Sequence, residues 1–355
     1  PCCNLRYQNA YRRDIRREWE WQCSLMDGSL NYRAQCALAI RNRILWRKDP
    51  ASWFKQFMSS PSWNPWLAFL AALFGTQLPM DEIPLYLECT GRSDLPAKQA
   101  REGWVVVGRR GGKSMVAALV ALYLATVREY HSYLSPGEVA TVMIIAADRK
   151  QARTVMRYIG GFIEADRQLA ALVLATTKES FTLSNRVVIE VHTCSFRAVR
   201  GYTIAGVICD EIAFWRTDYS ANPDTEVIAA IMPGMATIPS SLLLCIGSPY
   251  AKRGALWDSY CKHYGKPGDF LIWQAETIKM NPDLDRTIVD RSYEDDAIAA
   301  SAEYGAQFRG DIDSYVSHEA VQANVVAGRI RLPPIAGIQY RAFIDPSGGS
   351  SDSMT

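Results

Sequence analysis

The sequence predicts an α/β protein with a mostly parallel central sheet flanked by helices. Short apolar runs of strand length recur along the chain, and helix-length segments separate some of them. One run passes through a glycine-rich stretch into an apolar segment, which is the pattern of a strand-to-helix turn. The predicted strands cover residues 104–107, 141–147, 186–192, 204–209, 242–246 and 270–275.

The predicted helices lie around these strands. Residues 114–129 are apolar and 148–163 are polar, and both have helical length. Residues 59–75 also read as a helical region, as does the mainly polar stretch 287–327. Two prolines, Pro333 and Pro334, then break the chain before a last predicted strand at 340–345.

Composition limits the classes of partner and site. The length of 355 residues suggests one large or two modest domains. The net charge is only +2, so any DNA-binding surface must be a local basic patch. Nine cysteines include no CxxC pair, so we expect reduced, buried thiols such as Cys194, Cys209 and Cys245, and no zinc site. The apolar run 115–127 is shorter than the ~20 residues of a membrane span, so we expect no membrane contact.

Residues 1–57 are rich in arginine and tryptophan and differ in composition from the rest of the chain. A basic helix contacting nucleic acid is one interpretation, and a solvated helical face is another. A third is that this segment is not native and lies upstream of the natural start, because Met58 begins a region resembling a natural N-terminal helix.

A glycine-rich stretch follows the run 104–107 and opens a helix, which is the context of a P-loop. Glycines let backbone N–H groups turn toward phosphate, and the helix N-terminus adds partial positive charge. We expect Lys113 to reach the β- and γ-phosphates of ATP and Ser114 to bind Mg²⁺. The usual GxxxxGK[ST] pattern places a glycine where Val107 stands, so a plain glycine-rich turn is the alternative. The stretch is Gly108, Arg109, Arg110, Gly111, Gly112, Lys113 and Ser114.

Two carboxylates, Asp210 and Glu211, end the apolar run 204–209. Burying carboxylates there is costly unless a cation or hydrogen bonds compensate. Asp210 is predicted to hold Mg²⁺ through water, and Glu211 to activate the attacking water. A solvated turn is the alternative. GTPases usually lack this glutamate, and the chain contains no guanine-reading Asn-Lys-x-Asp.

These motifs resemble those of tailed-phage large terminases, the motors that pump DNA into capsids. That family also places arginine inside a P-loop without a strict first glycine. The segment Ser195–Tyr202 is similar to the one preceding the family's acidic pair, and Leu243–Pro249 resembles its coupling motif. The resemblance covers roughly residues 62–355 and depends on the order of these motifs.

The resemblance implies a RecA-like P-loop NTPase of the additional-strand, catalytic-glutamate class. Arg109 would touch the γ-phosphate from within the subunit, and Ser248 would sense hydrolysis, a turn serine before Pro249 being the alternative. Arg149 or Arg153 would be the arginine supplied to a neighbouring subunit, with a solvated helix face as the alternative.

Three further residue assignments stay open. Arg197 and Arg200 could contact DNA phosphate or nucleotide. The adenine site is less visible, and Gln99 and Arg101 are its weak candidates.

Large terminases also carry an RNase H-like nuclease domain, and Tyr340–Gly349 resembles its beginning, with Asp345 as a metal ligand. The alternative for Asp345 is a turn residue before Pro346. Because a two-metal site needs more carboxylates than this stretch supplies, we expect no nuclease activity. The expected divisions are an N-terminal segment at 1–57, a P-loop ATPase domain at 58–285, a helical linker at 286–334 and the start of a nuclease domain at 335–355.

The resemblance further implies double-stranded DNA, a portal protein and a small terminase subunit as partners, and a homo-oligomeric ring as the assembly. The protein would work in the host cytoplasm, docked on the portal vertex of the procapsid. Two alternatives are another nucleic-acid motor ATPase, such as a helicase, and a truncated fragment that binds nucleotide without turnover.

Overall fold

The computed structural model describes residues 42–216 and 222–310, together with scattered residues between 323 and 341. Most of the segment 1–57, the predicted last strand and Asp345 lie outside the described residues. All six other predicted strands appear, joined by two more. The strands are β1 Glu102–Val107, β2 Ala140–Ala146, β3 Val173–Thr176, β4 Ser180–Leu183, β5 Val187–Thr193, β6 Thr203–Asp210, β7 Leu242–Gly247 and β8 Phe270–Ala275.

The strands form one sheet in the order β3-β4-β5-β2-β6-β7-β1-β8. Six of them, from β5 to β8 across the sheet, pair in parallel. The unpredicted β3 and β4 pair antiparallel at one edge, where β3 is largely exposed although residues 169–175 are all apolar. Strand β7 lies between β1, which leads into the P-loop, and β6, which ends in the acidic pair. This inserted strand confirms the predicted RecA-like, additional-strand class.

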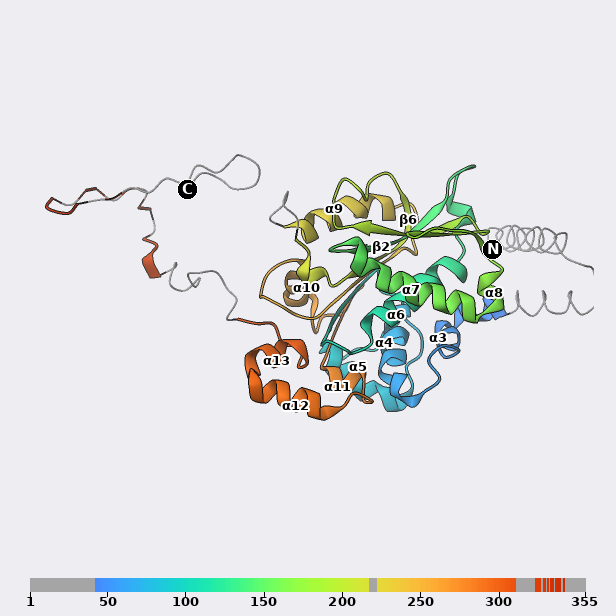
Figure 1. The fold of residues 1–355 in the computed structure, drawn as a ribbon, viewed down its shortest axis with the longest axis horizontal. Helices are drawn as coiled ribbons and strands as arrows, with labels where there is room; N and C mark the ends of the chain where they lie inside the picture. The colour runs from blue at the N-terminus through green and yellow to red at the C-terminus, as the bar shows by residue number, and fades with distance from the viewer. Residues whose placement is uncertain are drawn as a thin grey trace, which may run out of the picture.

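Helices cover both faces of the sheet (Figure 1). Helix α6 is apolar on all sides because it is enclosed between the sheet and other helices. Its neighbour α7 is amphipathic and begins after the N-cap Asp148, whose side chain accepts from Gln151 N at 2.9 Å. The helices are α3 Pro50–Phe54, α4 Asn64–Phe74, α5 Ile83–Thr90, α6 Lys113–Thr126, α7 Arg149–Ala165, α8 Arg167–Ala170, α9 Pro223–Met235, α10 Ala255–His263, α11 Thr277–Met280, α12 Arg286–Asp295 and α13 Ala297–Glu303.

Two hydrophobic clusters fill the space on either side of the sheet. Alternate strand residues point to opposite faces, so Val105 and Val107 join the cluster under α4, α6 and α7, while Trp104 and Val106 join the one under α9 and α10. The thiols expected to be buried, Cys194, Cys209 and Cys245, are buried. This packing fixes the strand ends, and therefore the edge on which the phosphate loop sits.

The larger cluster includes residues on the N-terminal side of Met58. Trp53 and Phe54 are almost fully buried. The ring of Phe54 lies 5.7 Å from that of Phe74 and 5.2 Å from that of Tyr123, between ring centroids. Residues 50–57 therefore pack with the core that contains the sheet, although they were predicted to be part of the N-terminal segment 1–57.

Parallel pairing brings the carboxyl ends of β1, β7 and β6 to one edge of the sheet. Val106 is paired with Gly247, and Asp210 with Ile246. The P-loop, Ser248 and Glu211 follow these strand ends directly. Residues more than a hundred positions apart in sequence therefore meet in one place, as is usual for ligand sites in parallel sheets.

Across the described parts of the chain, none of the helices combines the length and the apolar character needed to cross a bilayer.

Replacing Phe54 with alanine tests whether the residues before Met58 stabilise the core. We expect Phe54→Ala to lower the free energy of unfolding by about 3–5 kcal/mol, because it removes a fully buried ring from an aromatic cluster. The exposed neighbour Lys55 provides the control, and Lys55→Ala should change stability by less than about 0.5 kcal/mol. Urea denaturation followed by tryptophan fluorescence measures both. Equal, small effects would show that this segment is not part of the folded core.

Candidate active site

The P-loop crosses from the end of β1 to the start of α6. Gly112 has a φ of 91° and Arg110 a φ of 62°, so both lie in the left-handed region. Glycine enters this region without penalty, whereas arginine does so at a cost of about 1 kcal/mol or more. The surrounding structure must hold Arg110 there.

Successive carbonyl groups of the loop each accept a hydrogen bond. Three of the donors are side chains from distant elements: Thr277 Oγ1 donates to Arg109 O at 2.9 Å, Asn281 Nδ2 to Arg110 O at 2.8 Å, and Trp66 Nε1 to Gly111 O at 2.7 Å. These three donors hold the orientation of successive peptide groups of the loop, while the amide of Arg109 itself donates to Glu303 O. Loop amides that face a phosphate form an anion-binding surface.

Gly108 explains the departure from the usual P-loop pattern. A Cβ at this position would lie 2.2 Å from Thr277 Oγ1 and less than 3 Å from the carbonyl oxygens of Glu303 and Tyr304. The chain after β8 packs so closely on the loop that only glycine fits here. Val107, at the position of the usual first glycine, is instead buried in the core as the last residue of β1.

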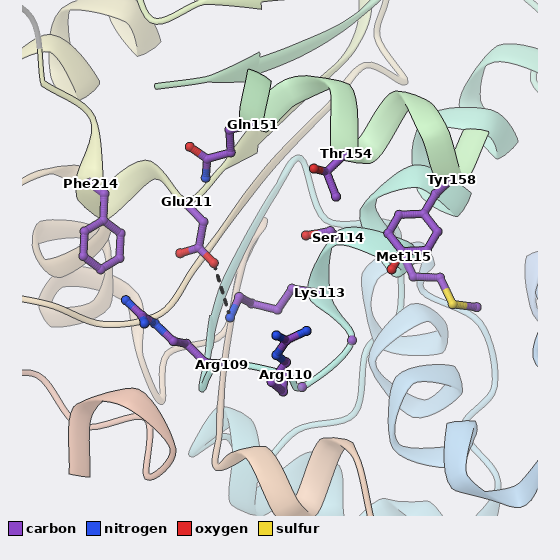
Figure 2. Close-up of a pocket in the computed structure, with 12 residues that line it drawn as sticks. Arg109, Arg110, Lys113, Ser114, Met115, Gln151, Thr154, Tyr158, Glu211 and Phe214 are labelled. Atoms are coloured by element: carbon purple, nitrogen blue, oxygen red, sulfur yellow. Dashed lines mark ion pairs between the residues drawn. The ribbon is translucent and has the colours of Figure 1, made fainter. Parts of the chain in front are cut away.

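Lys113 places its ammonium group at the centre of the site. The Nζ atom donates to Val107 O at 2.8 Å, to Gly108 O at 2.9 Å and to Ser248 Oγ at 2.9 Å. It also lies 3.5 Å from Glu211 Oε1 (Figure 2). Burial lowers the pKa of Lys113 below its ordinary 10.5, while the negative charges of Glu211 and Asp210 act in the opposite direction.

Glu211 is tied to the strand beside its own. Its Oε2 accepts from the backbone N–H of Ser248 at 3.0 Å, while its Oε1 faces Lys113. The φ of Glu211 is 49°, a second non-glycine residue of the site in the left-handed region. Lys113, Ser248 and Glu211 therefore form one connected group at the ends of β1, β7 and β6.

Asp210 is a buried carboxyl group with one orphaned oxygen. Its Oδ1 is fully buried and has no hydrogen-bond partner among the described residues. Burial raises the pKa of Asp210 from 3.8 to about 7, the charge of Glu211 adds to the rise, and Lys113 opposes it. A buried carboxyl group without a compensating partner, beside a phosphate-binding loop, is well placed to bind a cation.

The donor set fits magnesium bound together with phosphates. Within the described residues there is no group of three or more His, Cys, Asp or Glu side chains able to hold a metal by themselves. Mg²⁺ in nucleotide sites takes one or two protein oxygens and completes its shell with phosphates and water. Asp210 and Ser114 supply such a pair of oxygens.

A cavity of about 660 Å³ opens over the loop. Figure 2 shows the side chains of Glu211 and Lys113 pointing toward each other among its lining residues, with Ser114 between Lys113 and helix α7. Its outer wall comes from α7, whose lining residues are spaced three and four apart and so share one helix face. The lining residues are Arg109, Arg110, Gly111, Gly112, Lys113, Ser114, Met115, Gln151, Thr154, Tyr158, Glu211 and Phe214.

The predicted arginines divide into two groups. Arg109 and Arg110 line the cavity. Arg153 lies on α7 beside the cavity-lining Thr154, but its guanidinium is 4.0 Å from Glu179 Oε1 and largely exposed. Arg149 begins the same helix. These two remain candidates for an arginine acting on a neighbouring subunit.

Arg197 and Arg200 lie on the segment before β6 and are exposed. The guanidinium of each is 5.6 Å from the ring centroid of Phe196, so this ring supports both cations. Neither is among the cavity-lining residues.

The two adenine candidates lie at the far end of β1 from the P-loop. Gln99 donates to Ser240 O at 3.2 Å, and Arg101 directly precedes the first residue of β1. The P-loop follows the other end of that strand, about 20 Å away for a strand of this length.

Several residues of the site carry no sequence signal. Trp66, Thr277 and Asn281 support the loop from outside any recognisable motif. Gln151, Thr154 and Tyr158 could have been found as the polar stripe of the helix after β2, because a strand's carboxyl end leads into the site. The stripe alone, however, is equally typical of a solvated face.

Comparison with solved structures finds phage large terminases. The ATPase domain of the Thermus phage P74-26 large terminase shares 17% identity over 63% of this chain and 97% of that chain, with a TM-score of 0.44. For the HK97 bacteriophage large terminase the identity is 16% over 59% of this chain and 47% of that chain, with a TM-score of 0.44. For the large terminase of a thermophilic bacteriophage, solved in complex with ADP, it is 11% over 59% and 48%, with a TM-score of 0.41.

No protein-family model matches the chain, and no curated protein matches it. The chain is thus similar in structure to terminase ATPase domains, and it spans about half of the two longer proteins.

The raised pKa of Asp210 makes the stability of the metal-free protein depend on pH. Because this pKa is higher in the folded protein than in the unfolded chain, the carboxyl stabilises most below about pH 4, and that stability is lost as the pH rises through about 7. With a chelator present, Asp210→Asn should therefore exceed the wild type in stability by roughly 4 kcal/mol at pH 8, and by less at pH 5. Thermal unfolding at both pH values measures this gap.

The exposed Asp258→Asn variant serves as the control and should show no gap that grows with pH. A constant difference between Asp210→Asn and the wild type across this range would contradict the assignment.

Proposed function

We propose that this chain hydrolyses ATP and that hydrolysis drives the movement of double-stranded DNA. The observation that carries the ATPase part is the connected group of Lys113, Ser248 and Glu211 at the P-loop end of the sheet. It combines a cation for phosphates and a carboxylate for water, both lining one cavity, with Ser248 in contact with each of them. Hydrolysis of a phosphoanhydride needs little else beyond positioning and charge.

Glu211 is proposed to activate the attacking water. Its Oε1 and Oε2 are held by Lys113 and by Ser248 N–H, so the carboxylate has a fixed direction. Water oxygen attacks the γ-phosphorus and its proton passes to this carboxylate. The bond from that phosphorus to the bridging oxygen breaks, and ADP keeps the bridging oxygen.

Lys113, Arg109 and the loop amides are proposed to stabilise the charge of the transferred phosphoryl group. Ser114 and Asp210 would hold Mg²⁺, which when bound neutralises charge on the β- and γ-phosphates. The Lys113 ammonium already donates to three acceptors, so phosphate oxygens would replace one or more of them when nucleotide binds.

Ser248 is proposed to report on hydrolysis. Its hydroxyl accepts from Lys113 and its backbone N–H donates to Glu211, so it touches both the phosphate-binding and the water-activating group. A change in either contact would shift Ser248 and therefore the chain that follows β7. That chain is Pro249 and the turn leading to α10.

The DNA-motor part rests on the order of motifs that resembles phage large terminases. By that resemblance the chain would act as the ATPase half of a packaging motor in a homo-oligomeric ring. It would dock with a portal protein on a procapsid in the host cytoplasm and work with a small terminase subunit. Arg149 or Arg153 would then reach the site of the adjacent subunit and stabilise its transition state.

Removing the two central charges should abolish ATP turnover. We expect Lys113→Ala and Glu211→Gln each to lower kcat at least ~100-fold, because one removes the phosphate cation and the other the water-activating carboxylate. Steady-state phosphate release, measured over a range of protein concentrations with Mg²⁺, provides the test. Activity that rises with concentration would indicate sites completed between subunits.

Two exposed residues give matched controls, since Lys178→Ala and Glu226→Gln make the same changes away from the site. Both should retain wild-type rates. If Glu211→Gln keeps more than about a third of wild-type activity, Glu211 does not activate the water.

DNA binding should depend steeply on salt and little on sequence. A motor that grips the phosphate backbone releases counterions, so we expect affinity for long duplexes to fall about 10³-fold between ~50 and ~200 mM salt if six or more phosphates are contacted. Fluorescence anisotropy with duplexes of unrelated sequence measures this, and ATPase assays with the same DNA measure stimulation. Salt-independent affinity would count against the DNA motor, and ATP-driven strand separation would favour a helicase.

A further inference from the structure

The helices that follow β8 return to the P-loop and hold Arg109 by its backbone. The amide of Arg109 donates to the carbonyl of Glu303 at 2.5 Å, and its carbonyl accepts from Thr277 Oγ1 at 2.9 Å. Thr277 N donates to Tyr304 O at 2.8 Å, which joins α11 to the end of α13. The main chain of Arg109 is thus fixed against the last residue of α13.

This arrangement places the Arg109 side chain next to a carboxylate. Nη1 lies 3.2 Å from Glu303 Oε1, and both side chains are about half exposed, at 56% and 41%. The same arginine lines the cavity with Lys113 and Glu211 (Figure 2). One guanidinium therefore stands within reach of two anionic partners, the Glu303 carboxylate and any phosphate bound in the cavity.

We propose that Glu303 is a positioning residue that competes with the third phosphate of ATP for Arg109. This inference rests on the proposed ATPase function. ATP brings a γ-phosphate that draws Arg109 away from Glu303, whereas ADP lacks this group and leaves the ion pair in place. Glu303 therefore lowers the affinity for ATP and leaves the affinity for ADP unchanged.

The exchange also gives the region after β8 a means of responding to the bound nucleotide. In one state Glu303 is paired, and in the other its carboxylate is released while its backbone stays attached to Arg109 N–H. The end of helix α13 therefore keeps the Glu303–Arg109 ion pair when ADP is bound and loses it when ATP is bound. The size of the effect is limited, since exposed ion pairs contribute little and are screened by salt.

The experiment compares nucleotide affinities of the full chain by calorimetry, using Mg²⁺ with ADP or with a non-hydrolysable imido analogue of ATP. We expect Glu303→Gln to bind the ATP analogue about two- to five-fold more tightly than the wild type, because the competing charge is gone. The dissociation constant for ADP should change by a smaller factor than that for the ATP analogue. The ratio of the two dissociation constants is the readout, because a purely structural defect would weaken both.

A double-mutant cycle identifies the partner. In an Arg109→Gln background, Glu303→Gln should no longer change the affinity for the analogue, because the arginine for which the two anions compete is absent. The control is Glu88→Gln, which removes the carboxylate of another ion pair, with Lys279 of α11; neither residue lines the cavity. This variant should keep the wild-type ratio.

Two results would overturn the inference while leaving the ATPase proposal intact. One is an unchanged ratio of the two dissociation constants in Glu303→Gln, whether neither nucleotide or both nucleotides bind more tightly. The other is an effect of Glu303→Gln that persists without Arg109. A wild-type chain that binds neither nucleotide would overturn the proposed function and the inference together.

Discussion

A buried ammonium group organises the centre of this protein. Lys113 lies under the loop with only 6% of its surface exposed, and an isolated charge there would be very costly. Its oxygen partners come from the end of β1, from Ser248 after β7 and from Glu211 after β6. These partners meet only if three parallel strands keep their register, so the hydrophobic packing of the sheet and the charge balance of the site depend on each other.

The shape of the phosphate loop depends on residues far from it in sequence. Its outward carbonyls are held by Trp66 from the N-terminal helices and by Thr277 and Asn281 from the region after β8. Gly108 is required because that region packs directly against the loop. The proposed site therefore depends on contacts from the whole described core. The chain after β8 helps to form the proposed nucleotide site, because it packs against the loop.

Two residues of the proposed site have a strained backbone. Of the four described non-glycine residues with positive φ, Arg110 lies in the loop and Glu211 after β6, while Arg186 and Ala306 lie elsewhere. Such conformations cost about 1–3 kcal/mol each and persist only when neighbouring contacts determine them. Asn281 holds the carbonyl of Arg110, while Lys113 and Ser248 hold the carboxylate of Glu211. Both strained residues line the cavity.

The sequence alone determined the fold class, six of the strands and the motif residues Lys113, Ser114, Asp210, Glu211 and Ser248. Apolar runs and glycine-rich turns are local patterns, and local patterns can be read one residue after another. The tertiary structure decided what these patterns could not: the hairpin β3–β4 at an exposed edge, the support of the loop by Trp66, Thr277 and Asn281, and the pairing of Arg109 with Glu303. These contacts join positions up to about two hundred residues apart, and only the folded sheet brings them together.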